Sequence, residues 1–138
     1  MKPPSDSGAY AGPFRILCVE DDPQVGLLLV KLLTRAGYTV QHVANGSDAW
    51  DLLLDSFDRI ELVITDNNLP GFTGLELVQL IRQTTYRGGV IVHCGALNAS
   101  DQAAYDALNV DSIVLKDVTA TQLLAAVAAV RAKGQHSA

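Results

Sequence analysis

The chain has 138 residues, 49% of them hydrophobic, and a formal net charge of −5. This length suits one globular domain that buries about two thirds of its unfolded surface. Because Lys and Arg are scattered singly in an acidic chain, a protein that binds the phosphate backbone of nucleic acid is disfavoured.

In chain order, the hydrophobic pattern predicts five short strands that alternate with five helices. Short apolar, β-branched runs predict strands at residues 14–19, 38–43, 61–65, 90–94 and 112–115. Apolar residues at helical spacing predict helices at 23–36, 47–56, from 73 to about 81, 100–108 and 119–132. Residues 1–12 and 134–138 lack such periodicity, so we expect flexible tails on either side of one domain at residues 13–133.

Capping residues set the expected helix starts. Asp22 followed by Pro23 favours the start of the first helix, and Ser100 is the expected cap of the fourth. In the first helix, the apolar positions expected to face the core are Val25, Leu28, Leu29, Leu32 and Leu33. Leu27 and Val30 fall outside this stripe, so we expect them on the exposed side of the helix.

Alternation of strands with helices predicts a parallel sheet covered on both faces and joined by right-handed crossovers. This is the doubly wound α/β class. Such sheets bind ligands beyond the carboxyl ends of their strands, where the strand order reverses. The residues at those ends are therefore the candidates for a functional site.

Four of the predicted strand ends carry side chains with useful chemistry. The first ends at Glu20 and Asp21, the third at Asp66, the fourth at Cys94 and the fifth at Lys116. Carboxylates about 4 Å apart at an effective dielectric constant near 20 repel by roughly 4 kcal/mol, so a cation is expected among them. Oxygen ligands favour Mg²⁺ over zinc, which prefers His and Cys.

Each of these residues also has an ordinary explanation. Asp66 precedes turn residues and can simply cap a loop, Glu20 and Asp21 suit a helix start, and Lys116 suits a solvated strand end. Their coincidence at one edge of a sheet favours a functional site. His93 is not expected to join it, because adjacent strand residues such as His93 and Cys94 face opposite sides of the sheet.

Over about residues 14–132 the chain resembles the receiver domain of two-component response regulators. The resemblance rests on the pair Glu20-Asp21, the run Asp66-x-x-Leu69-Pro70-Gly71-x-x-Gly74, and Lys116. It implies a flavodoxin-like fold with strand order 2-1-3-4-5. It also implies transfer of a phosphoryl group to Asp66 from a histidine kinase or a histidine phosphotransfer protein.

The same resemblance assigns roles around Asp66. Mg²⁺ would be held by Asp21, Asp66 and the backbone carbonyl of Asn68, with Glu20 acting through a water, and Lys116 would pair with the phosphoryl group. The Asn68 side chain lies near the phosphoryl group in similar domains, where it helps to position the hydrolytic water.

Three positions depart from the family pattern. Cys94 stands where Thr or Ser is usual, Ile113 where Tyr or Phe is usual, and Asp117 where Pro commonly follows the Lys. A thiol is a weak hydrogen-bond donor. We therefore expect phosphorylation chemistry with a muted or rerouted conformational response. Cys94 as a redox-sensitive thiol is an alternative, although a free Cys is more often a small buried hydrophobic residue.

The sequence also leads to expectations about setting and partners. Two cysteines in apolar runs, no signal peptide and no membrane-length segment predict a cytoplasmic protein without membrane contact. No output domain follows Ala132, so we expect a stand-alone receiver that passes its phosphoryl group on or binds a downstream protein; a fragment of a longer protein is the alternative. We expect no enzyme activity beyond self-phosphotransfer and slow autodephosphorylation. Receivers typically dock kinases on the first helix, which makes Leu27 and Val30 candidate contacts.

Two rival functions remain. A pseudo-receiver would never take a phosphoryl group and would act only as a protein-binding module. A small hydrolase of phosphorylated substrates would need another acid near Asp66, and Asn68 occupies that place.

Overall fold

Five mostly apolar strands form the centre of the fold. A computed structural model describes residues 13–136, so the tail predicted at residues 1–12 lies outside the described residues. The strands are β2 (Arg15–Val19), β3 (Thr39–Val43), β4 (Leu62–Thr65), β5 (Gly89–Cys94) and β6 (Ser112–Leu115). All pairs are parallel and the order is β3-β2-β4-β5-β6, which confirms the predicted order 2-1-3-4-5.

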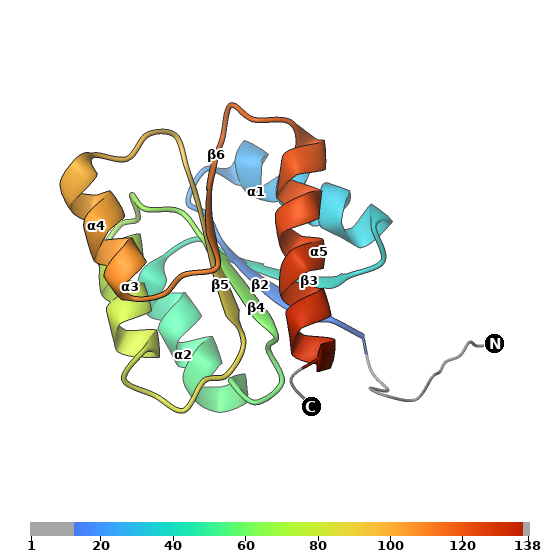
Figure 1. The fold of residues 1–138 in the computed structure, drawn as a ribbon, viewed down its shortest axis with the longest axis horizontal. Coiled ribbons are helices and arrows are strands. Elements are labelled where there is room, and N and C mark those ends of the chain that lie inside the picture. The colour runs from blue at the N-terminus through green and yellow to red at the C-terminus, as the bar shows by residue number, and fades with distance from the viewer. Residues whose placement is uncertain (1–12, 137–138) are drawn as a thin grey trace.

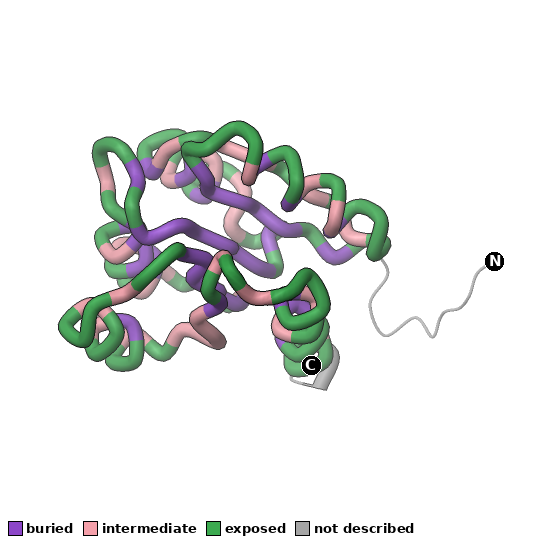
Figure 2. The backbone as a smooth tube through the Cα atoms, turned by 90° about the horizontal axis from the view of Figure 1, so that it is seen from above, coloured by how far each residue is buried: buried purple, intermediate pink, exposed green. Residues whose placement is uncertain are grey.

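Helices cover both faces of this sheet (Figure 1). They are α1 (Pro23–Arg35), α2 (Gly46–Ser56), α3 (Gly74–Ile81), α4 (Ala99–Ala107) and α5 (Ala120–His136). One apolar cluster joins the sheet to α1 and α5, with Leu33 and Val127 fully buried. A second joins it to α2, α3 and α4, with Leu77 and Tyr105 fully buried. Figure 2 shows the buried backbone concentrated in the strands between these two layers.

Local sequence explains most helix starts. Asp22 caps α1 by accepting hydrogen bonds from the backbone amides of Gln24 and Val25 at 2.9 and 3.3 Å, and Pro23 is the first helical residue, as predicted. The predicted cap of α4 was wrong by two residues. Asn98, not Ser100, is the cap, because its side-chain oxygen accepts from the amide of Asp101 at 2.7 Å.

The buried stripe of α1 is narrower than predicted. Gly26, Leu29 and Leu33 face the core, whereas Leu28 is 67% exposed, so its predicted burial was wrong. The reason is close packing of the helix on β3. A side chain at position 26 would clash with the ring of His42, so the helix turns its glycine face toward the sheet.

The last helix is longer than the predicted 119–132, since α5 continues to His136. Residues 134–136, predicted as part of a tail, are therefore helical. In these final turns, the Nζ of Lys133 lies 2.7 Å from Oδ1 of Asp111, the residue before β6. Within residues 13–136, no helix combines the length and the apolar character needed to cross a membrane.

Candidate functional site

The carboxyl ends of β2, β4 and β6 bring the predicted residues to one edge of the sheet. Val19 pairs with Thr65 in the register of β2 and β4, so Glu20 and Asp66 follow their strands at the same level. The backbone pairing continues past the strand ends, since the amide of Asp66 donates to the carbonyl of Val19 at 3.0 Å. Likewise, the amide of Lys116 donates to the carbonyl of Cys94 at 2.7 Å.

Lys116 bridges two buried carboxylates. Its Nζ lies 2.9 Å from Oε1 of Glu20 and 3.0 Å from Oδ2 of Asp66. Glu20 is 1% exposed and Asp66 6%, whereas the Lys116 side chain keeps 26% of its surface in solvent. Burial alone would lower the pKa of Lys116, but hydrogen bonds to both carboxylates raise it above its usual value. The ammonium therefore stays charged.

One ammonium does not balance the acids around it. Glu20, Asp21 and Asp66 each present an oxygen atom within 4.8 Å of the other two, and Asp21 is exposed. Burial raises the pKa of Glu20; Lys116 and the backbone amide of Asp22 oppose this, and the charge of Asp66 adds to it. A cluster of carboxylate oxygens with excess negative charge suits a hard divalent cation such as Mg²⁺.

The loop after β4 holds Asp66 in place. The backbone amide of Asn68 donates to Oδ1 of Asp66 at 3.3 Å, and the Thr65 hydroxyl donates to the carbonyl of Asp66 at 2.9 Å. Gly74, at the start of α3, packs so closely that any Cβ would clash with that same carbonyl. The side chain of Asn68 is exposed. Its backbone carbonyl as a metal ligand stays a prediction.

Cys94 and Ile113, two of the positions that depart from the family pattern, belong to one apolar cluster. Cys94 is fully buried, and Ile113 is partly buried and packs against the same cluster. Burial raises the pKa of Cys94, and the charge of Asp66 adds to this effect. A buried thiol held in its protonated form is a poor nucleophile, which favours the hydrophobic interpretation of Cys94 over the redox one.

The structure does not bring His93 into the acidic cluster. Its ring is 8% exposed, and burial lowers its pKa, with a further contribution from Lys116. Of the candidate docking residues on α1, Leu27 is 55% exposed, as predicted, but Val30 is half-buried, so its predicted exposure was wrong.

Sequence reasoning missed Asn67 and Tyr105. The Asn67 side chain is buried, and its Oδ1 accepts a hydrogen bond of 2.6 Å from the hydroxyl of the fully buried Tyr105 in α4. In the sequence, Asn67 is only one of the turn residues that follow Asp66. The available signal was Tyr105 itself, the one aromatic residue in a short helix of alanines and polar residues.

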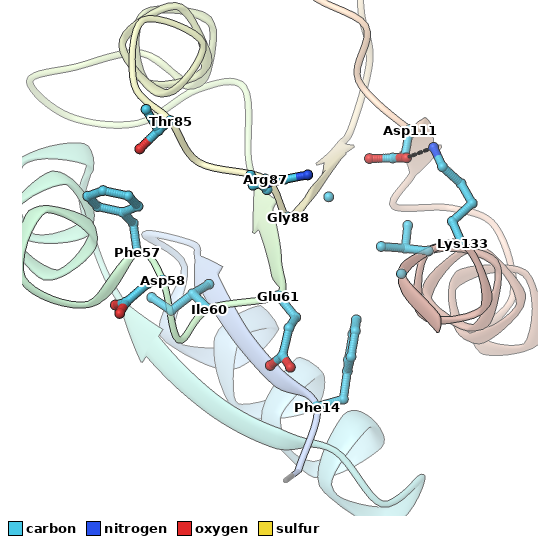
Figure 3. Close-up of a pocket in the computed structure, with 13 residues that line it drawn as sticks. Phe14, Phe57, Asp58, Ile60, Glu61, Thr85, Arg87, Gly88, Asp111 and Lys133 are labelled. Atoms are coloured by element: carbon cyan, nitrogen blue, oxygen red, sulfur yellow. Dashed lines mark hydrogen bonds and ion pairs between the residues drawn. The ribbon is translucent and has the colours of Figure 1, made fainter. Parts of the chain in front are cut away.

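A hollow of about 720 Å³ lies at the opposite edge of the sheet, where the strands begin (Figure 3). Its lining includes Phe14, Glu61 and Lys133, and none of the predicted site residues. Three of the charged residues that line it make contacts within the fold. Lys133 pairs with Asp111, and Glu61 accepts a hydrogen bond from the amide of Arg15 at 2.7 Å. The hollow is therefore separate from the acidic edge.

Comparison with known proteins gives a consistent picture. The model of the response regulator receiver domain family matches residues 16–128. The response regulator RppA of Synechocystis is 44% identical over 68 residues, 49% of this chain and 29% of that protein. The probable transcriptional regulatory protein SilR of Salmonella typhimurium is 31% identical over 121 residues, 87% of this chain and 52% of that protein. The chain thus spans about half or less of the length of these relatives.

Solved structures agree on the fold. A response regulator receiver domain protein from Clostridium thermocellum superimposes with a TM-score of 0.85 at 20% identity, covering 91% of this chain and 99% of the other. The signal receiver domain of an HD domain-containing protein from Pseudomonas fluorescens gives a TM-score of 0.81 at 25% identity, covering 92% and 100%.

Proposed function

Because the chain belongs to the response regulator receiver domain family of two-component signalling, we propose that it accepts a phosphoryl group on Asp66 from a histidine kinase or a histidine phosphotransfer protein. One observation carries the proposal: Oδ2 of Asp66 lies 3.0 Å from the Lys116 ammonium, inside a cluster that also contains Glu20 and Asp21. Receiver domains are signalling modules and not classical enzymes, so the chemistry is one self-phosphorylation followed by slow hydrolysis.

Asp66 is the proposed nucleophile. One of its carboxylate oxygens forms a bond to phosphorus while the bond between phosphorus and the donor breaks, and the electron pair of that bond leaves with the donor. The Lys116 ammonium is placed to stabilise negative charge on the phosphoryl oxygens. The exposed Asn68 side chain is the candidate for positioning the water that later hydrolyses the acyl phosphate.

The residues that would hold Mg²⁺ are Asp21, Asp66 and the backbone carbonyl of Asn68, with Glu20 acting through a water. When bound, the ion would neutralise charge on the transferred phosphoryl group. The excess of carboxylates over ammonium groups at this edge supports the assignment.

The proposed read-out is atypical. Cys94 offers no hydroxyl and Ile113 no aromatic ring, so the usual coupling between these positions is missing. The same observation favours the second candidate function, a pseudo-receiver that binds a protein partner without phosphorylation. In both cases we expect a downstream protein target and a cytoplasmic setting, with the exposed Leu27 on α1 as a candidate contact for the kinase or phosphotransfer protein.

A mass measurement tests the proposal. The purified chain is incubated with Mg²⁺ and acetyl phosphate, and the intact masses of wild type and Asp66→Asn are compared. A phosphate adduct on wild type alone supports phosphorylation of Asp66, and its absence with EDTA supports the metal requirement. No adduct on wild type favours the binding module, and turnover of the donor without an adduct favours a hydrolase.

A further inference from the structure

Tyr105 connects α4 to the loop that carries Asp66. Its ring is fully buried, and its hydroxyl lies 2.6 Å from Oδ1 of Asn67. Burial raises the pKa of Tyr105, and the charge of Asp101 adds to this, so the hydroxyl stays protonated. Tyr105 is therefore the donor, and the side-chain carbonyl of Asn67 is the acceptor that faces α4.

Asn67 is held at three of its atoms. Besides the bond from Tyr105, its Nδ2 donates to Oδ2 of Asp101 on α4 at 3.4 Å, and its backbone carbonyl accepts from the amide of Gly74 at 2.9 Å. Asn67 stands between Asp66, the proposed phosphoacceptor, and Asn68, whose carbonyl is a proposed metal ligand. Fixing Asn67 therefore fixes the backbone that presents both groups.

We propose that Tyr105 is a positioning residue for phosphoryl transfer: through Asn67 it orients the backbone from Asp66 to Asn68, and it couples the state of Asp66 to α4. This inference rests on the proposed function. A population shift requires contacts that differ between two states. A phosphoryl group on Asp66 that displaces Asn67 changes the short buried hydrogen bond between Asn67 and Tyr105. Because Tyr105 lies on α4, the change reaches that helix. The route needs neither Cys94 nor Ile113.

A pair of identical substitutions tests the inference. Tyr105→Phe removes the hydroxyl that reaches Asn67. Tyr86→Phe is the matched control, because the Tyr86 side chain is also buried and its hydroxyl donates to the carbonyl of Gly89 at 3.0 Å, at the opposite edge of the sheet. Both variants lose one buried phenol hydrogen bond, so a purely structural role predicts the same behaviour for both.

The first readout is the Mg²⁺ dependence of phosphorylation by acetyl phosphate, followed by intact mass. We expect Tyr105→Phe to raise the half-saturating Mg²⁺ concentration roughly tenfold, as loss of a group that orients a metal ligand commonly does, and Tyr86→Phe to leave it unchanged. In an Asn67→Ala background, Tyr105→Phe should have no further effect, because the two residues act as one unit.

The second readout is the backbone amide spectrum with and without beryllofluoride, a phosphoryl mimic. We expect shifts across α4 in wild type and Tyr86→Phe, and their loss in Tyr105→Phe. If Tyr105→Phe and Tyr86→Phe behave alike in both readouts, the inference about Tyr105 is overturned. The proposed function is still supported in that case if wild type forms an Asp66-dependent phosphate adduct. No adduct on wild type overturns both. If Tyr105→Phe does not fold, Asn67→Ala alone must raise the Mg²⁺ requirement, and an unchanged requirement overturns the inference.

Discussion

Lys116 offsets part of the negative charge of the acidic edge, because it alone bridges Glu20 and Asp66 among the described residues. Lys116→Met leaves two buried carboxylates facing each other. We expect it to lower the free energy of unfolding by about 3 kcal/mol, a typical cost of breaking a buried ion pair. Millimolar Mg²⁺ should recover part of this loss, since the dication replaces the missing positive charge. Urea unfolding with and without Mg²⁺ measures both effects.

Lys133→Met is the control for this measurement. Lys133 is 73% exposed and pairs with Asp111 away from the acidic edge. Because the Lys133 side chain is largely exposed, its loss should cost about 0 to 1 kcal/mol and should not respond to Mg²⁺. A loss in Lys116→Met that Mg²⁺ leaves unchanged would contradict the proposed metal position.

His93 makes stability depend on pH. Burial lowers its pKa below the usual 6.5, so the unfolded chain takes up a proton more readily than the folded protein. Above about pH 6.5, His93 is neutral in both states and does not reduce the free energy of unfolding. As pH falls from there through the lowered pKa of the folded state, the unfolded chain takes up the proton first and the free energy of unfolding decreases. His93→Gln removes this titrating group. Below about pH 6.5, the difference in free energy of unfolding between wild type and His93→Gln should change by up to about 1.4 kcal/mol per pH unit. Urea midpoints at a series of pH values check it; parallel curves would refute the prediction.

At the scale of single elements, the start of α3 couples helix packing to the site. Gly74→Ala drives a methyl group into the backbone carbonyl of Asp66. We expect a loss of about 2 kcal/mol or more in unfolding free energy, since local backbone strain has costs of this order. The acetyl phosphate assay should show slower phosphorylation, because relief of the clash moves Asp66.

Gly134→Ala is the matched substitution in a helix without such contact. A Cβ at Gly134 would meet nothing within 4 Å. Because alanine favours the helical state over glycine, we expect a gain of about 0.5 to 1 kcal/mol in the free energy of unfolding. Equal effects of the two alanine substitutions in urea unfolding would show that helix propensity, and not the contact with Asp66, decides both.

The elements themselves were largely predictable, and the errors occur where residues far apart in sequence meet. Strands such as β4 and β5 are buried at every residue, so their continuous apolar runs were clear signals. The phase of α1 was less predictable because it depends on contact between Gly26 and His42, which are far apart in sequence. The last turns of α5 include Lys133, whose pairing with Asp111 periodicity cannot reveal.

At the scale of the whole molecule, the side chains of Cys94 and Ile113 predict a restricted conformational response to phosphorylation. With wild type, we expect beryllofluoride to cause small amide shifts in β5 and β6, because Cys94 has only a weakly donating thiol and Ile113 has no polar group. The double variant Cys94→Thr, Ile113→Tyr should enlarge these shifts, since it supplies the missing hydroxyl and ring. Large shifts across both strands in wild type would refute the prediction.

The site was predictable where it depends on strand ends and was missed where it depends on packing between elements. Glu20, Asp66 and Lys116 converge because parallel strands end at one edge of the sheet, a rule that applies before any coordinates are known. Asn67 and Tyr105 are 38 positions apart and meet only once α4 packs beside α3. No local pattern in the sequence encodes that meeting.

The hollow at the far edge has a practical consequence. Phe14 and Lys133, near the two ends of the described chain, both line it, on the side of the sheet away from Asp66. A surface tether attached beside Phe14 or Lys133 would therefore lie at the edge of the sheet opposite Asp66, the proposed phosphoacceptor. Immobilised at this edge, the protein should keep Asp66 accessible to candidate kinases on a sensor chip.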